Sequence, residues 1–258
     1  MMNYMKSEGY RLARDRGIML LLLTLCLLSF LFHAGLAWMG KADPGFRYVT
    51  TSFSFSNLVA NPMLFYYMGA VIGTIVCNGS RQNGNLKNTV AFGISRSRIF
   101  LGGCIMASLT AIVMLVIVLS VYILSAWMFL NHAGPVSLMD LISEIPAVFL
   151  LSIASLISGI ICMEVFDKSS TGVIVYLLIW FITPKILLYI GMRFDVVYDI
   201  AMWLPENFFS TQVMKVNMST CNTLWESGEG LMKCMMSGAA GVIIFTAIGL
   251  HLIRKREF

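Results

Sequence analysis

This sequence contains few charged side chains and few histidines, which are the residue types that form most catalytic and metal sites. Asp, Glu, Lys and Arg make up 12% of the 258 residues, and there are 3 histidines, whereas about 25% of an ordinary soluble domain is charged. His33, His132 and His251 are far apart along the chain, and their spacing matches no metal-ligand motif. Catalysis normally requires acids, bases or nucleophiles placed close together. We therefore expect no enzyme activity, no metal site and no cofactor bound by this chain.

A complete phosphate-binding loop is also missing. The octapeptide GLAWMGKA satisfies the pattern G-x-x-x-x-G-K but has Ala42 where Ser or Thr would bind magnesium. It straddles the outer end of the apolar run 17–39, whereas a phosphate loop joins a strand to a helix. No basic domain with interleaved aromatic residues is present to hold nucleic acid. Any use of ATP would therefore require another chain, and we expect no nucleic-acid partner.

Apolar residues dominate what is present. They account for 58% of the sequence, and the mean hydropathy is +0.81. A helix of about 20 apolar residues crosses a bilayer, and its backbone groups must bond within the helix because hydrocarbon offers no partners. We therefore expect an all-α polytopic membrane protein with six transmembrane helices, at about residues 17–39, 58–77, 99–130, 145–166, 171–192 and 236–253.

The Lys and Arg residues predict the orientation of these helices. Most of them lie before the first span, between the second and third spans, and after the sixth span, and Lys185 alone falls within a span. Basic residues near spans are retained on the cytoplasmic side. We therefore expect both termini to be cytoplasmic. The inner face, which carries most of the net charge of +5, would contact anionic lipid headgroups or an acidic partner.

The inner loop 78–98 is more organised than a bare connector. It reads NGSRQNGNLKNTVAFGISRSR, in which turn-forming Asn and Gly residues and bases surround a short apolar stretch. This pattern is typical of one or two turns of amphipathic helix at a membrane surface. A basic loop that only binds headgroups is the alternative.

This loop resembles the first inner loop of the permease subunits of type-2 ABC exporters. In that family a G-[TS]-[LI]-[KR]-N segment precedes a few apolar residues and then [IV]-S-R-x-[KR]-[IV]-[FL]. The matching residues here are Gly84, Leu86, Lys87, Asn88, Ile94, Ser95, Arg96, Arg98, Ile99 and Phe100. The sequence departs from the pattern at Asn85, where Thr or Ser is usual, and at Arg81 and Gln82, where an acidic residue often stands. Small permeases of the bacitracin-resistance and lantibiotic-immunity branch are similar, with six spans and cytosolic ends.

The resemblance implies that the loop is a coupling helix that docks against a separate ABC ATPase subunit, which would carry ATP and magnesium. The residues expected to couple are Arg81, Asn83, Gly84, Leu86, Lys87, Asn88, Phe92, Ile94, Ser95, Arg96 and Arg98. It also implies a second permease subunit, identical or homologous, and export of a hydrophobic or peptide substrate such as a lantibiotic across a bacterial plasma membrane. An ATP-independent transporter or channel and a non-transporting immunity protein are the alternatives.

Two segments outside the spans have an amphipathic character. Residues 1–16 alternate apolar and basic side chains, which predicts either an interfacial helix or a disordered basic tail. The outer segment 193–235 follows a fifth span that Pro184 and Lys185 interrupt, and Lys185 is expected either to snorkel outward or to face a substrate. Within this segment Pro205 can start a helix. The candidate outer substrate contacts are Lys185, Trp203, Phe208 and Phe209.

Small residues and cysteines give two further expectations. Gly69 and Gly73 form a G-x-x-x-G motif in the second span, which allows close helix packing either within the chain or with a second subunit. Cys221 and Cys234 both fall in the outer segment, where they form a disulfide or remain free thiols.

Overall fold

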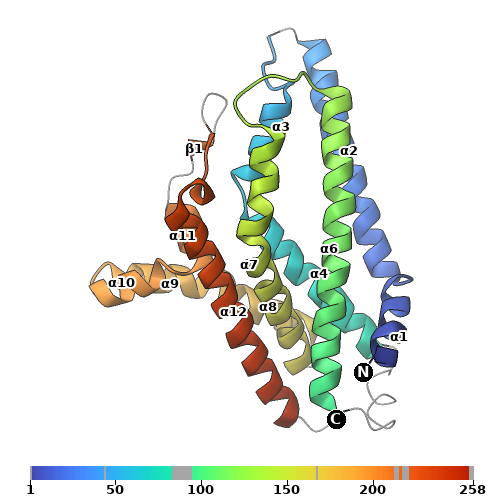
Figure 1. Ribbon diagram of the computed structural model, residues 1–258, viewed down its shortest axis with the longest axis vertical. Coiled ribbons are helices and arrows are strands. Elements are labelled where there is room, and N and C mark those ends of the chain that lie inside the picture. The colour runs from blue at the N-terminus through green and yellow to red at the C-terminus, as the bar shows by residue number, and fades with distance from the viewer. Residues whose placement is uncertain are drawn as a thin grey trace.

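The computed structural model describes residues 2–43, 45–82, 95–166, 168–211, 215–216 and 221–255. The chain is an all-α polytopic membrane protein, as the sequence predicts (Figure 1). The long helices are α2 (Arg16–Ala42), α4 (Met63–Gln82), α6 (Arg96–Phe129), α7 (Leu138–Val165) and α12 (Gly228–Lys255). The shorter elements are α1 (Met2–Leu12), α3 (Thr51–Val59), α8 (Ser169–Leu177), the π-helix η1 (Leu178–Ile182), α9 (Thr183–Gly191), α10 (Asp195–Ala201), α11 (Pro205–Thr211), the strands β1 (Lys215–Val216) and β2 (Cys221–Asn222), and the 3-10 helix η2 (Leu224–Glu226).

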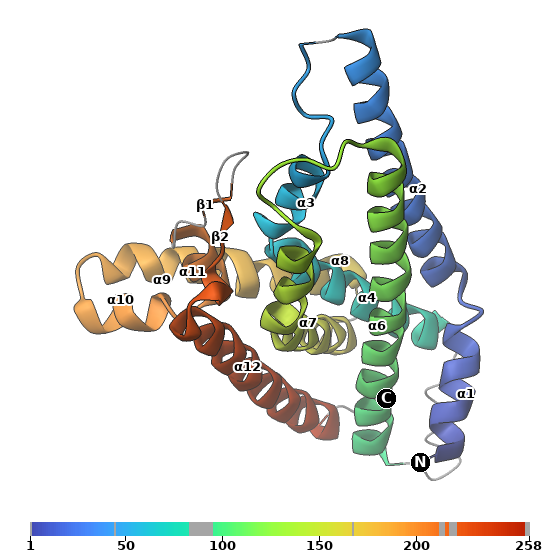
Figure 2. The ribbon, with the colours of Figure 1, turned by 45° about the horizontal axis from the view of Figure 1, so that its top comes forward.

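Helix α7 is the centre of the bundle. Buried residues make up 67% of its most apolar window, against 17% or less in the other four helices that are long enough to span a membrane. It packs against α4 on one side and α12 on the other (Figure 2). Its start is fixed by a capping box, in which Ser137 and Asp140 bond to one another's backbone N–H groups. The exposed apolar faces of α2 and α6 are what a membrane would cover.

Glycines let α4 approach α7 to backbone contact. A Cβ atom added at Gly69 would lie 2.5 Å from the carbonyl oxygen of Ser152, and one added at Gly73 would lie 2.7 Å from that of Leu156. Both distances are shorter than van der Waals contact, so no larger residue fits without a shift of the backbone. The G-x-x-x-G motif therefore packs α4 against α7 within the chain.

The second predicted span is not one continuous helix, and this corrects the expectation for residues 58–77. Helices α3 and α4 meet at an angle of 65° across a break of at most four residues, so the described residues contain five helices long enough to span, or six if the bent pair counts as one. Pro62 explains the break, because it lacks a backbone N–H and disfavours helical geometry at Asn61 before it. The bend lies inside the predicted span, because α3 ends at Val59, one residue after Leu58, and α4 begins at Met63.

The fifth span contains a π-helical turn at Leu178–Ile182 but continues to Gly191. Pro184 has no N–H to donate to the carbonyl of Trp180, four residues earlier, so the regular ladder is interrupted here. The Thr183 backbone N–H bonds to the carbonyl of Leu178, five residues earlier. The interruption of the span expected at Pro184 and Lys185 is therefore wrong, because both residues lie inside the continuous segment Ser169–Gly191 and the wide turn precedes them. Beyond it, α9 and α10 pack side by side and project from the bundle (Figures 1 and 2).

Both chain termini lie at one end of the bundle, which we call the terminal end (Figures 1 and 2). Helix α4 ends here and α6 begins here, on either side of residues 83–94. The connections from α2 to α3 and from α6 to α7 lie at the opposite end, where they are joined by a bond between the N–H of Thr51 and the carbonyl of Asn131 (2.9 Å). Six spans, with the bent pair counted as one, agree with this placement of the termini. That both termini are cytoplasmic stays a prediction.

Candidate functional site

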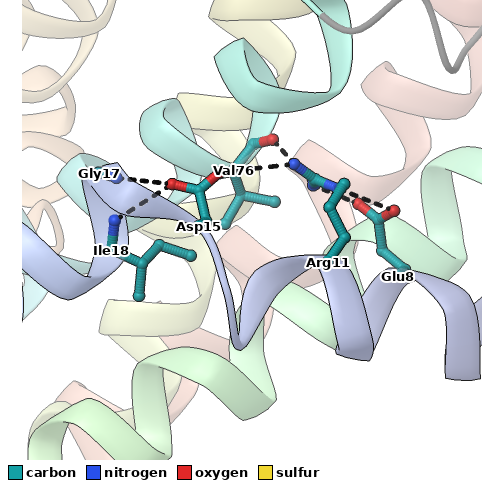
Figure 3. A network of polar contacts seen from close by, with 6 residues as sticks. All are labelled: Glu8, Arg11, Asp15, Gly17, Ile18 and Val76. Carbon is teal, nitrogen blue, oxygen red and sulfur yellow. Dashed lines mark hydrogen bonds and ion pairs between the residues drawn. The ribbon is translucent and has the colours of Figure 1, made fainter.

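At the terminal end, α1 is a docked helix rather than a disordered tail. Arg11 extends from α1 to donate to the carbonyl oxygen of Val76 on α4 (3.3 Å), while its Nε donates to Glu8 Oε2 (3.1 Å) (Figure 3). A second Arg11 nitrogen pairs with Asp15 Oδ2 at 3.7 Å. The side chain of Leu12 is 2% exposed, so the apolar face of α1 is buried against the bundle. The guanidinium group thus ties α1 to the last turns of α4.

Asp15 organises the turn between α1 and α2. Its Oδ1 accepts from the backbone N–H groups of Gly17 (2.8 Å) and Ile18 (3.2 Å), which caps the start of α2 (Figure 3). The same carboxylate forms the ion pair with Arg11. One acidic side chain therefore sets the direction in which α2 leaves α1.

Helix α1 also contacts α6. A Cβ atom at Gly102 would lie 2.9 Å from the ring of Tyr4, and one at Gly9 would lie 2.9 Å from the terminal methyl group of Met106. Burial raises the pKa of the Tyr4 phenol, and the Glu8 carboxylate raises it further. Helix α1 is thus bonded to α4 and packed against α6, the two helices that flank residues 83–94.

Most of the predicted coupling residues lie outside the described part of the chain. These are Asn83, Gly84, Leu86, Lys87, Asn88, Phe92 and Ile94, together with the side chain of Arg81, whose backbone belongs to α4. Of the remaining three, Ser95 is the exposed N-cap of α6, Arg96 is half-buried and Arg98 is exposed. Their role in coupling stays a prediction. The structure brings them to the terminal end, beside α1.

Replacing Asp15 with alanine is expected to loosen the start of α2 by about 1 kcal/mol, the usual contribution of an N-cap side chain. Amide hydrogen exchange at Gly17 and Ile18 should then accelerate by about five-fold. Asp15→Ser is the matched control, because serine can cap the helix but cannot pair with Arg11. Equal exchange rates in the two variants would contradict the assigned cap.

A buried polar cluster joins α4 to the outer segment; we call it the Glu206 cluster. Glu206, at the first turn of α11, is 5% exposed and accepts from the hydroxyl groups of Tyr66 (3.3 Å) and Tyr67 (3.1 Å). Lys185 lies 3.5 Å from its other oxygen and donates to Ser210 Oγ (2.9 Å). These bonds hold α11 against the bent second span.

The same cluster is continuous with hydroxyl groups in the centre of the bundle. Ser155 Oγ on α7 donates to the backbone carbonyl of Tyr66 (2.5 Å) and is 2.9 Å from the hydroxyl of Tyr176 on α8. Trp180, in the π-helical turn, donates to Ser158 Oγ (2.8 Å). All of these side chains are buried. Because buried polar groups are costly unless bonded, this network fixes the arrangement of α4, α7 and the fifth span.

These contacts correct two of the predicted outer substrate contacts. Phe208 and Phe209 are 0% and 6% exposed and belong to the hydrophobic core, so neither can meet a substrate at the surface in this state. Lys185 does not extend freely toward the membrane surface, because its ammonium group is paired with the carboxylate of Glu206. Trp203, at 46% exposed, remains at the surface, and the side chain of Lys185 is 36% exposed. The sequence marked all three aromatics alike because hydrophobicity does not tell core from interface.

Cys234 is a free thiol and is completely buried at the start of α12. The disulfide considered with Cys221 is therefore not formed, and the side chain of Cys221 lies outside the described part of the chain. Cys221 belongs to β2, where its backbone pairs with Val216 of β1.

Sequence reasoning missed a buried histidine cluster that joins three helices. His33 on α2 is 0% exposed, and its two ring nitrogens lie 2.7 Å from Ser125 Oγ on α6 and 2.7 Å from Ser54 Oγ on α3. Tyr122 donates to the Ser54 carbonyl (2.7 Å). With both nitrogens bonded to hydroxyls, His33 acts as a structural crosslink. The sequence did contain a signal for this cluster. A histidine inside an apolar run requires polar partners, and the Ser-rich segment 52–56 offers hydroxyl groups that can bond to it.

Glu144 was also missed, because the predicted fourth span began one residue after it. The structure starts α7 at Leu138, and Glu144 is 0% exposed there. Neither carboxyl oxygen has a hydrogen-bond partner among the described residues. The capping-box pair Ser137 and Asp140 was the signal for the earlier helix start. A carboxyl group buried without a partner is exceptional and indicates a functional role.

Comparison with models of known protein families finds no match to this chain, and no curated protein matches it. Within the described ranges, no group of three or more His, Cys, Asp or Glu side chains could hold a metal ion. The geometry of the terminal end, the Glu206 cluster and Glu144 is therefore the basis for a functional proposal.

Proposed function

We propose that this chain is the permease subunit of an exporter in a bacterial plasma membrane, driven by a separate ATPase subunit that binds ATP and magnesium. The observation that carries the proposal is the docking of α1 on both α4 and α6, the two helices that flank residues 83–94. Arg11 bonds to the Val76 carbonyl on α4, and Tyr4 packs against Gly102 on α6. A force applied between these two helices would act on one connected unit.

The packing beyond this unit supports transmission toward the opposite end. Helix α4 contacts α7 through Gly69 and Gly73 with no space for adjustment, and α7 contacts α12 in the same way through Gly238. Packed elements with such backbone contacts move together as rigid bodies rather than deform. A tilt of α4 at the terminal end would therefore reach the Glu206 cluster, which binds α4 through Tyr66 and Tyr67.

A second permease subunit, identical or homologous, completes the proposal. Helices α2 and α6 expose large apolar side chains over much of their length, including Leu20 (71%), Leu23 (68%) and Val116 (59%). Such faces are covered by lipid or by another membrane helix. A hydrophobic or peptide substrate would pass between two such subunits as they alternate between inward and outward exposure.

Replacing Lys87, Arg96 and Arg98 together with alanine is expected to reduce ATPase binding about ten-fold, because exposed charge pairs contribute about 0.5 kcal/mol each and three of them add up to about 1.5 kcal/mol. The matched control is the triple alanine variant of Lys41, Arg47 and Arg193, three exposed bases of the predicted outer segments. Binding is measured by copurification with the ATPase that the proposal requires, identified by its phosphate loop among the proteins that copurify with the unmodified chain. If both triple variants bind equally, the coupling role is wrong.

Glu144 favours a second candidate, an ATP-independent transporter that moves protons with its substrate. Buried carboxyl groups in membrane helices mark proton and ion paths. Glu144 is fully buried in α7 with both oxygens unpaired, whereas the other candidate carboxylate, Glu206, is satisfied by two tyrosines and a lysine.

Replacing Glu144 with glutamine separates these two functions. In a proton-coupled transporter, the variant should lose the dependence of transport on a pH gradient, because glutamine cannot bind and release a proton. In an ATP-driven permease, transport should remain dependent on the ATPase and should change little. Uptake into or release from proteoliposomes, with and without a pH gradient, is the measurement.

A further inference from the structure

An apolar cavity of about 310 Å³ lies between α2, α4, α6 and α7. The bend of the second span makes room for it, since Leu58 before the bend and Leu64 and Phe65 after it all line the wall. Its size is at the lower end of the range for small-molecule sites. The cavity is separate from the Glu206 cluster and from the terminal end, which share none of its lining residues.

The few polar side chains on its wall have already donated their hydroxyl protons, so they can only accept hydrogen bonds from an occupant. Ser29, Ser108 and Ser152 each donate to the carbonyl four residues earlier in their own helix, at 2.8, 2.8 and 3.0 Å. Tyr122 donates to the carbonyl of Ser54. A polar group placed here would find few partners in place of those it leaves in water. The lining therefore favours an occupant that is mainly apolar.

The depth of the cavity indicates where such an occupant comes from. Its floor contains Met114 and Leu156, which are 4% and 1% exposed, whereas Leu64, Ile112 and Phe149 on its wall are 37% to 45% exposed and mark the opening. Ile112 is near the middle of the 34-residue α6, about 24 Å along the helix from Arg96. An opening at this level of a membrane helix faces hydrocarbon.

We propose that this cavity binds one acyl chain of a membrane lipid or lipid-linked molecule. The wall supplies dispersion contacts and excludes water, while the polar head of the molecule would remain at the membrane surface. This assignment does not depend on an ATPase partner, so it can fail or hold independently of the exporter proposal.

Photo-crosslinking in proteoliposomes tests the proposal. The probe is phosphatidylglycerol with a diazirine in the middle of one acyl chain, and the adducts are mapped by mass spectrometry. We expect adducts to concentrate on Met68, Ile112, Leu115 and Phe149. In Ala111→Phe, whose added ring occupies the cavity, labelling of these residues should fall about ten-fold.

Val113→Phe is the matched control, because Val113 is on the same helix, is 58% exposed and does not line the cavity. It should leave the labelling unchanged. Adducts spread evenly over the exposed faces of α2 and α6 in the wild-type protein would overturn the proposal. This measurement uses the wild-type protein alone, so it does not depend on whether the variants fold. Preferential labelling of the cavity by a diazirine-bearing single-span apolar peptide instead of by the lipid would also overturn the proposal.

Discussion

Replacing Gly69 with alanine should lower the free energy of unfolding by about 3 kcal/mol. The new methyl group would lie 2.5 Å from the carbonyl oxygen of Ser152, so α4 and α7 must separate. Overpacking of a rigid core typically costs 1 to 3 kcal/mol, and a backbone neighbour cannot rotate away as a side chain can. Unfolding in mixed micelles, followed by circular dichroism, measures the change.

The control is Gly103→Ala on α6, where an added Cβ atom has no neighbour within 4 Å. Alanine is the better helix former, so this variant should be neutral or more stable by up to about 1 kcal/mol. Equal stability of the two variants would mean that the close approach of α4 and α7 is not present in the membrane.

Replacing Glu206 with alanine is expected to destabilise the outer segment by about 2 to 4 kcal/mol. The buried hydroxyl of Tyr66 and the partly buried hydroxyl of Tyr67 lose their acceptor, and an unsatisfied buried donor costs about 1 to 3 kcal/mol. Lys185 also loses its carboxylate partner. Because α11 is held to α4 by these bonds, limited proteolysis should cut between Gly191 and Trp203 before the rest of the chain unfolds.

Two further variants show whether the destabilisation comes from the lost hydrogen bonds or only from the lost negative charge. Glu229→Ala, at an exposed position of α12, should leave the proteolysis pattern unchanged. Combining Glu206→Ala with Tyr66→Phe and Tyr67→Phe should recover part of the loss, because the unsatisfied hydroxyls are removed. A purely additive result would show that Tyr66 and Tyr67 do not bond to Glu206.

The apolar runs predicted the long helices well because hydrocarbon leaves a backbone no alternative to helical bonding. Pro184 did not interrupt the fifth span as expected, because a π-helical turn before it absorbs the missing N–H and the helix continues to Gly191. The break at Pro62 was overlooked because Asn61 and Pro62 fall inside an apolar run. One proline hardly changes the hydropathy of such a run, although its missing backbone N–H interrupts the helix. Local bonding rules, rather than hydropathy, determine where a span bends.

Burial was the part that the sequence could not determine. Phe208 and Trp203 look alike in an aromatic outer segment, yet the first is enclosed by the core and the second is half exposed. Glu144 and His33 lie at or near predicted span ends, where solvation by headgroups is the usual outcome. Their complete burial depends on which helices pack against them, and this depends on contacts between residues far apart in the chain.

The most direct test of the proposed exporter is affinity purification of this chain from the membrane of its own host cell in mild detergent. The proposal predicts that an ATPase with a phosphate loop copurifies in a fixed ratio, and that its ATP hydrolysis changes when the chain is present. If no ATPase copurifies, and transport by the purified chain proceeds without ATP, the chain is not the permease of an ATP-driven exporter.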